Sequence, residues 1–93
     1  MVEFDLINPK EINIYNFDIY LDAVFENFYK IYRTSNICLN KLAVTSRLSN
    51  DTVRRIIKYI EDGTTYSFKY ETIKKASEFV YNVLQYSGED NVQ

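Results

Sequence analysis

The stretch from residue 39 to residue 60 constrains the fold more than any other part of this chain, because it carries two helical patterns separated by a break. Apolar residues with the i, i+3, i+4, i+7 spacing of one helix face mark its second half: Val53, Ile56, Ile57 and Ile60. Ser49 is a favoured N-cap residue, and Gly63 can take the left-handed conformation that ends a helix. We therefore predict a helix at roughly residues 37–46, a turn at Arg47-Leu48, and a second helix that begins after Ser49.

Composition favours a single helical domain. With 93 residues the chain is too short for two independent cores, and its hydrophobic content of 46% is enough for one. Only two Gly and one Pro interrupt it, which disfavours a turn-rich sandwich. We expect a mainly α domain over residues 1–93, with four to five helices in a body at residues 16–86 and a flexible polar tail at residues 87–93.

The N-terminal segment, residues 1–15, has a different pattern. Apolar and acidic side chains alternate over residues 2–6, Asn8-Pro9 marks a turn, and apolar residues return at Ile12 and Ile14. This pattern predicts a short strand that either forms a hairpin or belongs to an extended arm. Because a lone hairpin is marginally stable in water, we expect the segment to pack on the helical body.

The first long helix is predicted from an N-cap at Asn16 to about Arg33. Its core stripe has spacings of three and four: Phe17, Leu21, Val24, Phe28 and Ile31 or Tyr32. Additional aromatic residues make it apolar over more than one stripe: Tyr20, Phe25, Tyr29 and Tyr32. We expect the N-terminal arm or a partner protein to cover this excess.

The last helix is predicted from an N-cap at Ser67 and a first residue at Phe68 to about Tyr86. Its expected inward residues are Ile73, Ala76, Val80, Val83 and Leu84, with Phe79 beside them. Its expected solvent-facing residues are Lys69, Glu71, Lys74, Lys75 and Glu78.

Charge is distributed unevenly along the chain. Residues 1–29 carry six acids and one base (−5), residues 30–60 carry seven bases and one acid (+6), and residues 61–93 carry six acids and three bases (−3). A nucleic-acid-binding protein needs a local basic face rather than a basic total, so the net charge of −2 does not exclude one. The other interpretation is a solvated surface with uneven charge.

These observations favour a helix-turn-helix at residues 39–60 that binds double-stranded DNA, with its second helix in the major groove. The candidate DNA-binding residues lie on both helices and the turn: Asn40, Lys41, Arg47, Ser49, Asn50, Asp51, Thr52, Arg54, Arg55 and Lys58. Residues 49–52 would approach bases, and the basic residues would meet bases or phosphates. The alternative is that the i, i+4 pairs Asp51–Arg55 and Lys58–Asp62 neutralise this charge on a solvated helix.

Residues 39–58 resemble the helix-turn-helix of lambda-repressor/Cro-like (XRE-type) regulators of bacteria and phages. Leu42-Ala43 matches an apolar-small pair in the first helix of that motif, Leu48 matches the apolar residue after the turn, and Val53 and Ile56 match two anchors of the recognition helix. The resemblance implies a lambda-repressor-like domain that reads DNA. It extends more weakly over residues 17–84.

The chain departs from that family pattern at four places. Arg47 stands where a turn glycine is usual, and a left-handed Arg there costs roughly 1 kcal/mol. Ser46 replaces an apolar residue, Leu39 replaces a frequent Gln, and the second helix continues to Ile60.

Other chemistries find little support. The lone Cys38 is expected to be a small buried or capping residue, and without His or a second Cys we expect no zinc and no other cofactor. Nothing indicates an enzyme, because there is no His base and no Gly-rich phosphate loop. With neither a signal peptide nor a membrane-spanning run, we expect a cytoplasmic protein that does not enter a membrane.

We therefore expect a small sequence-specific transcriptional regulator of phage or mobile-element type, acting as a homodimer on a two-fold site. The alternative is a protein-binding module on the same fold, an antirepressor or a phage inhibitor of a host protein, that uses its acidic and aromatic surface. The operator, any effector, the dimer interface and the choice between activation and repression are not encoded in any recognisable motif.

Overall fold

The computed structural model describes the backbone of residues 7–92 and the side chains of residues 7–85. A short 3-10 helix, η1 (Pro9–Glu11), precedes four α-helices: α1 (Phe17–Ser35), α2 (Leu39–Ser46), α3 (Asn50–Asp62) and α4 (Tyr70–Val92). The prediction of a mainly α chain with four to five helices is confirmed at this level. No strand occurs among the described residues.

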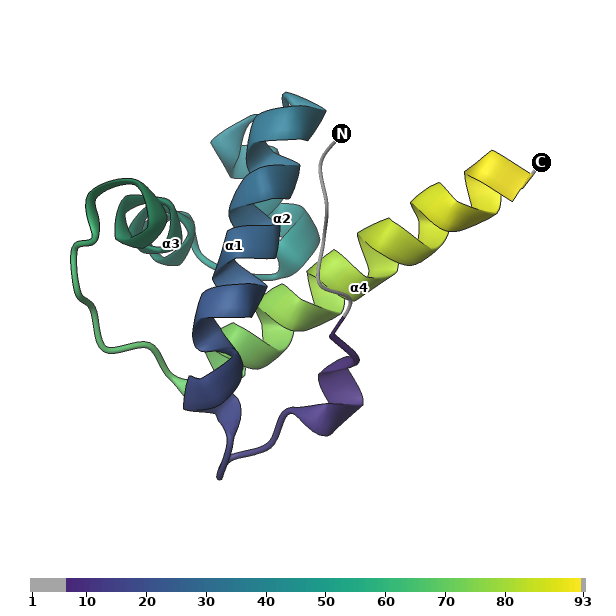
Figure 1. Ribbon diagram of the computed structural model, residues 1–93. Helices are drawn as coiled ribbons and strands as arrows, with labels where there is room; N and C mark the ends of the chain where they lie inside the picture. Colours follow the sequence, from purple (N-terminus) through teal and green to yellow (C-terminus); the bar gives the residue numbers. More distant parts are fainter. Residues whose placement is uncertain (1–6, 93) are drawn as a thin grey trace.

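The four helices pack around one another in two crossing pairs. α1 lies across the first half of α4 and also contacts α3, while α2 packs against α3 and α4. The second half of α4 projects past the other helices, and the connector from α3 to α4 runs along one side of the molecule (Figure 1). α3 is therefore held by α1 and α2 on one side and is open on the other.

The core lies where the predicted apolar stripes of the helices meet. The fully buried side chains, each at most 1% exposed, come from all four helices and from the segment before α1: Ile12, Val24, Phe25, Phe28, Leu42, Val53, Ile56, Ile73 and Ala76. Ala43 is also buried, as expected for the small residue of the α2 pair. Burying such side chains is the main source of stability, at about 1.5–3 kcal/mol for each large apolar residue.

The N-terminal segment differs from its prediction. Residues 1–6, where the first strand was expected, lie outside the described residues. Residues 9–11 form η1 instead of a hairpin, because the Asn8 side chain accepts a hydrogen bond from the backbone N–H of Lys10 (3.0 Å) and Pro9 presets a helical φ at the first position. The segment does pack on the body, since Ile12 is 1% exposed.

Two expectations about the start of α4, its first residue and its cap, are wrong. α4 begins at Tyr70 rather than Phe68, and Ser67 does not cap it, because the Lys69 carbonyl accepts its first hydrogen bonds from Thr72 and Ile73. Phe68 instead lies against Phe25 at 4.7 Å between ring centroids. The connector and α3 thus cover part of the aromatic excess of α1.

Three further residues or segments differ from expectation. Lys74 does not face solvent but is partly buried, and its ammonium donates to the carbonyls of Pro9 and Ile12. Cys38 occupies the N-cap position of α2, as one interpretation had it, but it is exposed rather than buried. The backbone of α4 continues to Val92, beyond the expected end near Tyr86.

Candidate functional site

The turn between α2 and α3 is closed by backbone hydrogen bonds. Arg47 has a left-handed φ of 65°, its N–H donates to the carbonyl of Val44 (3.2 Å), and the N–H of Leu48 donates to the carbonyl of Ala43 (3.0 Å). This is the hydrogen-bond pattern of a Schellman motif. The turn lies where it was predicted, at Arg47-Leu48, and takes the left-handed geometry that usually selects glycine.

The unexpected Ser46 is accommodated within this turn. Its side chain is 2% exposed, and its hydroxyl donates to the carbonyl of Leu42 at 2.7 Å. A buried hydroxyl with a partner avoids the cost of an unsatisfied polar group. The candidate residues Asn40, Lys41 and Arg47 are all exposed on α2 and the turn.

The N-terminus of α3 is fixed by its predicted cap. The Ser49 hydroxyl accepts a hydrogen bond from the backbone N–H of Thr52 (3.1 Å) and lies 2.8 Å from the Thr52 hydroxyl. The Ser49 hydroxyl thus caps the helix, and the Thr52 hydroxyl is bonded to it. Asn50 and Asp51 are exposed beside them, at the end of a helix whose dipole attracts anions.

The outer face of α3 carries the basic residues. Val53, Ile56 and Ile57 are buried on its inner face, whereas Arg54, Arg55 and Lys58 are exposed. The i, i+4 ion pairs of the alternative interpretation do not form in the described part of the chain, which shows one pair on this face, Arg54 to Asp51, at 3.9 Å. With 61% and 78% of these two side chains exposed, solvent screening leaves the pair with little energy. The positive charge of this face is therefore largely available to a binding partner.

The C-terminal half of α3 is tied to α1 by two tyrosine hydroxyls. Tyr59 donates to the Asp22 carboxylate at 2.5 Å, and Tyr29 donates to the Glu61 carboxylate at 2.8 Å. The hydrogen bond to Asp22, with burial adding to it, raises the pKa of Tyr59 above the ordinary 10.0. The hydrogen bond to Glu61 raises the pKa of Tyr29 in the same direction. These contacts hold the C-terminal half of α3 against α1.

Residues of the α3–α4 connector extend the site in a way that the sequence did not indicate. A hollow of about 280 Å³ is lined by Thr52, Arg55, Ser67, Phe68, Lys69 and Thr72. The Arg55 guanidinium also lies 5.8 Å from the centroid of the Tyr66 ring. Lys69 is thus placed near Arg55, although the sequence assigned it to the solvent face of a last helix that began at Phe68.

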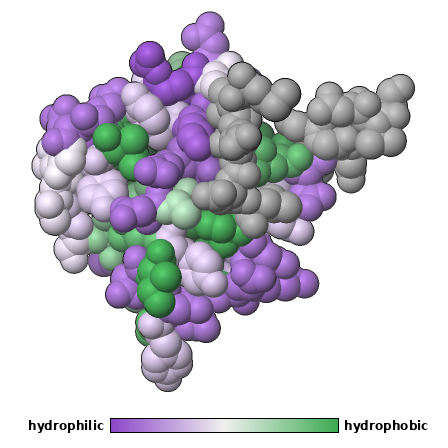
Figure 2. Space-filling model, in the orientation of Figure 1, coloured by the Kyte–Doolittle hydropathy of each residue, from purple (hydrophilic) through white to green (hydrophobic). Residues whose placement is uncertain are grey.

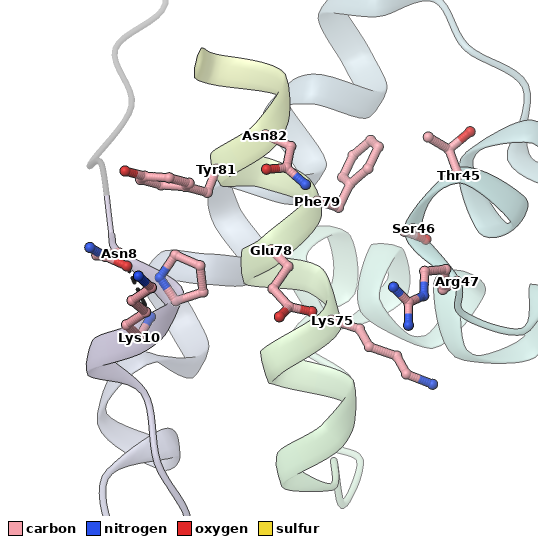
Figure 3. Close-up of a pocket in the computed structure, with 11 residues that line it drawn as sticks. Asn8, Lys10, Thr45, Ser46, Arg47, Lys75, Glu78, Phe79, Tyr81 and Asn82 are labelled. Carbon is pink, nitrogen blue, oxygen red and sulfur yellow. Dashed lines mark hydrogen bonds between the residues drawn. The ribbon is translucent and has the colours of Figure 1, made fainter. Parts of the chain in front are cut away.

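A larger groove of about 440 Å³ lies between η1, the end of α2 and the first half of α4. Figure 3 shows Arg47 and Lys75 on one side of it, Lys10 on the other, and Glu78 on α4 between them. Arg47 therefore lies where the basic surface of α2 and α3 meets this groove. None of these four charged side chains takes part in an ion pair within the described part of the chain.

The described residues contain no cluster of Cys, Asp or Glu suited to a metal ion, and no described helix is long and apolar enough to cross a membrane. In comparisons with known proteins, no family model, no curated protein and no solved structure matches this chain.

Proposed function

We propose that this protein is a sequence-specific DNA-binding regulator that places α3 in the major groove, with α2 and its turn forming the rest of a lambda-repressor-like helix-turn-helix. The observation that carries the proposal is the outer face of α3. Its three basic side chains, Arg54, Arg55 and Lys58, are exposed on the side opposite its buried apolar residues. Lys41 and Arg47 are also exposed, on the preceding helix and turn. Rigid support on one side and available positive charge on the other are what DNA recognition by a helix requires.

The residues divide into three roles under this proposal. Asn50 and the Arg54–Arg55 pair reach base edges, where Asn pairs with adenine and Arg with guanine by two hydrogen bonds. Lys41, Arg47, Lys58 and the newly found Lys69 contact phosphates and set the register. Ser49 and Thr52 act mainly through the cap that orients the helix. A single helix reads a short site, so a homodimer on a two-fold operator completes the proposal.

Fluorescence anisotropy with duplex DNA from upstream of the gene, at two salt concentrations, tests the proposal. Binding should weaken as salt rises, with a slope of roughly −0.9 for each phosphate neutralised. Arg54→Ala with Arg55→Ala should abolish specific binding while leaving helicity intact. The matched control, Lys10→Ala with Arg33→Ala, removes the same charge from exposed positions on η1 and α1 and should bind nearly as well.

Two results would contradict the proposal. The first is the absence of salt-sensitive binding to any upstream fragment. The second is an equal loss of binding in the control and in the α3 variant, since this would show attraction by overall charge rather than by the α3 face.

A further inference from the structure

A turn before α1 presents large apolar side chains to solvent. Tyr15 is 92% exposed and Ile14 is 64% exposed, and Ile19 in the first turn of α1 is 76% exposed. Figure 2 shows apolar side chains protruding at the lower edge of the molecule, where Figure 1 places this turn. Ile14, Tyr15 and Ile19 together form an apolar tip.

The backbone of the tip is held in one conformation by two asparagine side chains. The Asn13 carboxamide oxygen accepts hydrogen bonds from the N–H groups of Tyr15 (2.8 Å) and Asn16 (3.1 Å). The Asn16 side chain accepts from the N–H of Asn13 (2.8 Å) and donates to the carbonyl of Glu11 (2.9 Å). An Asn that bonds to the backbone two residues on is a recognised way of fixing a turn. The exposure of the tip is therefore built into the fold rather than due to a loose loop.

Both ends of the turn are also anchored to α4. Ile12, directly before it, is buried, and its carbonyl accepts a hydrogen bond from the Lys74 ammonium (3.2 Å). Phe17, directly after it, lies edge-on to Tyr70 with 5.8 Å between ring centroids. A partner that binds the tip thus meets apolar side chains whose backbone is already ordered, which lowers the entropy cost of binding.

The charge beside the tip is mainly acidic after Lys10, and the Lys74 ammonium on its inner side is taken up by the carbonyls of Pro9 and Ile12. From Glu11 to Tyr29 the sequence contains four acids and no base, and Glu11 and Asp18 are exposed directly beside the apolar side chains. Two tips brought together in a symmetric dimer would place these carboxylates opposite one another, which is unfavourable. An apolar surface bordered by basic residues is the complementary partner.

We propose that the apolar tip is a docking element for a second, different protein, which receives Tyr15 in an apolar pocket rimmed by Lys or Arg. Tyr is enriched among the residues that dominate binding energy at interfaces. The tip lies at the N-terminal end of α1, and the 19 residues of α1 separate it from the start of α2 by about 28 Å at 1.5 Å per residue. The proposal does not depend on DNA binding.

Site-specific photocrosslinking in cells of the natural source tests the proposal. A benzoylphenylalanine crosslinker replaces Tyr15, and the control carries it at Val44, an apolar residue that is 78% exposed on α2. The crosslinker at the tip should trap one protein that the control does not. That protein, purified, should bind the wild-type chain more weakly as salt rises.

Variants then assign the binding to the tip. Tyr15→Ala should weaken binding by about thirty-fold, as for an interface hot spot, and Asn13→Ala should weaken it several-fold by loosening the turn without removing an apolar side chain. Val44→Ala, and Arg54→Ala with Arg55→Ala, should bind like the wild type. The proposal is overturned if the tip traps nothing beyond the control, if it traps a second copy of this chain, or if the trapped protein binds Tyr15→Ala undiminished.

Discussion

Arg47→Gly is expected to stabilise the protein while weakening its proposed binding to DNA. Arg47 holds a φ of 65°, a conformation that costs an L-residue roughly 1–2 kcal/mol and glycine almost nothing. Against this gain, glycine adds about 0.5–1 kcal/mol of unfolded-chain entropy. The Arg47 side chain makes no hydrogen bond or ion pair in the described part of the chain, so little else is lost. The net expectation is a stabilisation of about 0.5–1 kcal/mol.

Urea denaturation followed by circular dichroism measures this change. The midpoint should rise by a few tenths molar, because the dependence of the unfolding free energy on urea is about 1–3 kcal/mol per molar for small domains. Gly63→Ala provides the reverse control. Gly63 has a φ of 73° with no atom within 4 Å of an added Cβ, so the substitution introduces backbone strain without a clash and should cost about 1 kcal/mol.

The same variant tests the phosphate contact proposed for Arg47. Loss of one phosphate contact should reduce the magnitude of the salt slope of DNA binding by about 0.9. A destabilised Arg47→Gly variant would refute the strain argument, and an unchanged salt slope would remove Arg47 from the proposed interface.

Three further substitutions test the packing, the cap and the tyrosine bonds. Phe25→Ala removes a fully buried ring that contacts Phe68 and Tyr59, and it should cost about 3–5 kcal/mol in urea denaturation. Ser49→Ala should cost about 1 kcal/mol through loss of the α3 cap. Ser67 caps no helix, so the control Ser67→Ala should be nearly neutral. Because folding raises the pKa of Tyr59 above 10.0, its stabilising contribution is present below that pH and is lost as the pH rises through the raised value. Tyr59→Phe should therefore lose less stability than the wild type between about pH 9 and about pH 11; an equal loss would contradict the assignment.

The helices could be predicted where a local pattern determines them. The apolar spacing of Val53, Ile56 and Ile57, with a cap at Ser49, is sufficient to place α3. The left-handed end at Gly63 was predicted from the conformational freedom of glycine, whereas a left-handed Arg47 was suggested only by the resemblance, whose motif usually has glycine there. Local sequence therefore predicted the α2–turn–α3 segment to within about two residues.

Long-range contacts decided the features that could not be predicted. Ser67 is a good cap by its residue type, yet α4 starts later because Phe68 is used to cover Phe25, 43 positions earlier in the chain. The helical period places Lys74 on the solvent face of the last helix, but its ammonium donates hydrogen bonds to the carbonyls of Pro9 and Ile12. Neither pairing leaves a periodic signal in the sequence.

The candidate site divides in the same way. Exposure of Arg54, Arg55 and Lys58 followed from the helical period alone. The sequence did not predict that Lys69 lies near Arg55, because this depends on the path of the connector. Nor did it predict that Asp51 pairs with Arg54, because this depends on side-chain rotamers.

Binding of DNA by the outer face of α3 can be followed by amide NMR of the labelled protein during titration with a duplex selected from a random-sequence library. The proposal predicts salt-sensitive shift changes at residues 40–41, 47–55 and 58, with little change at the apolar tip. Changes confined to α1 and α4, or no selected duplex that shifts any α3 amide, would contradict it.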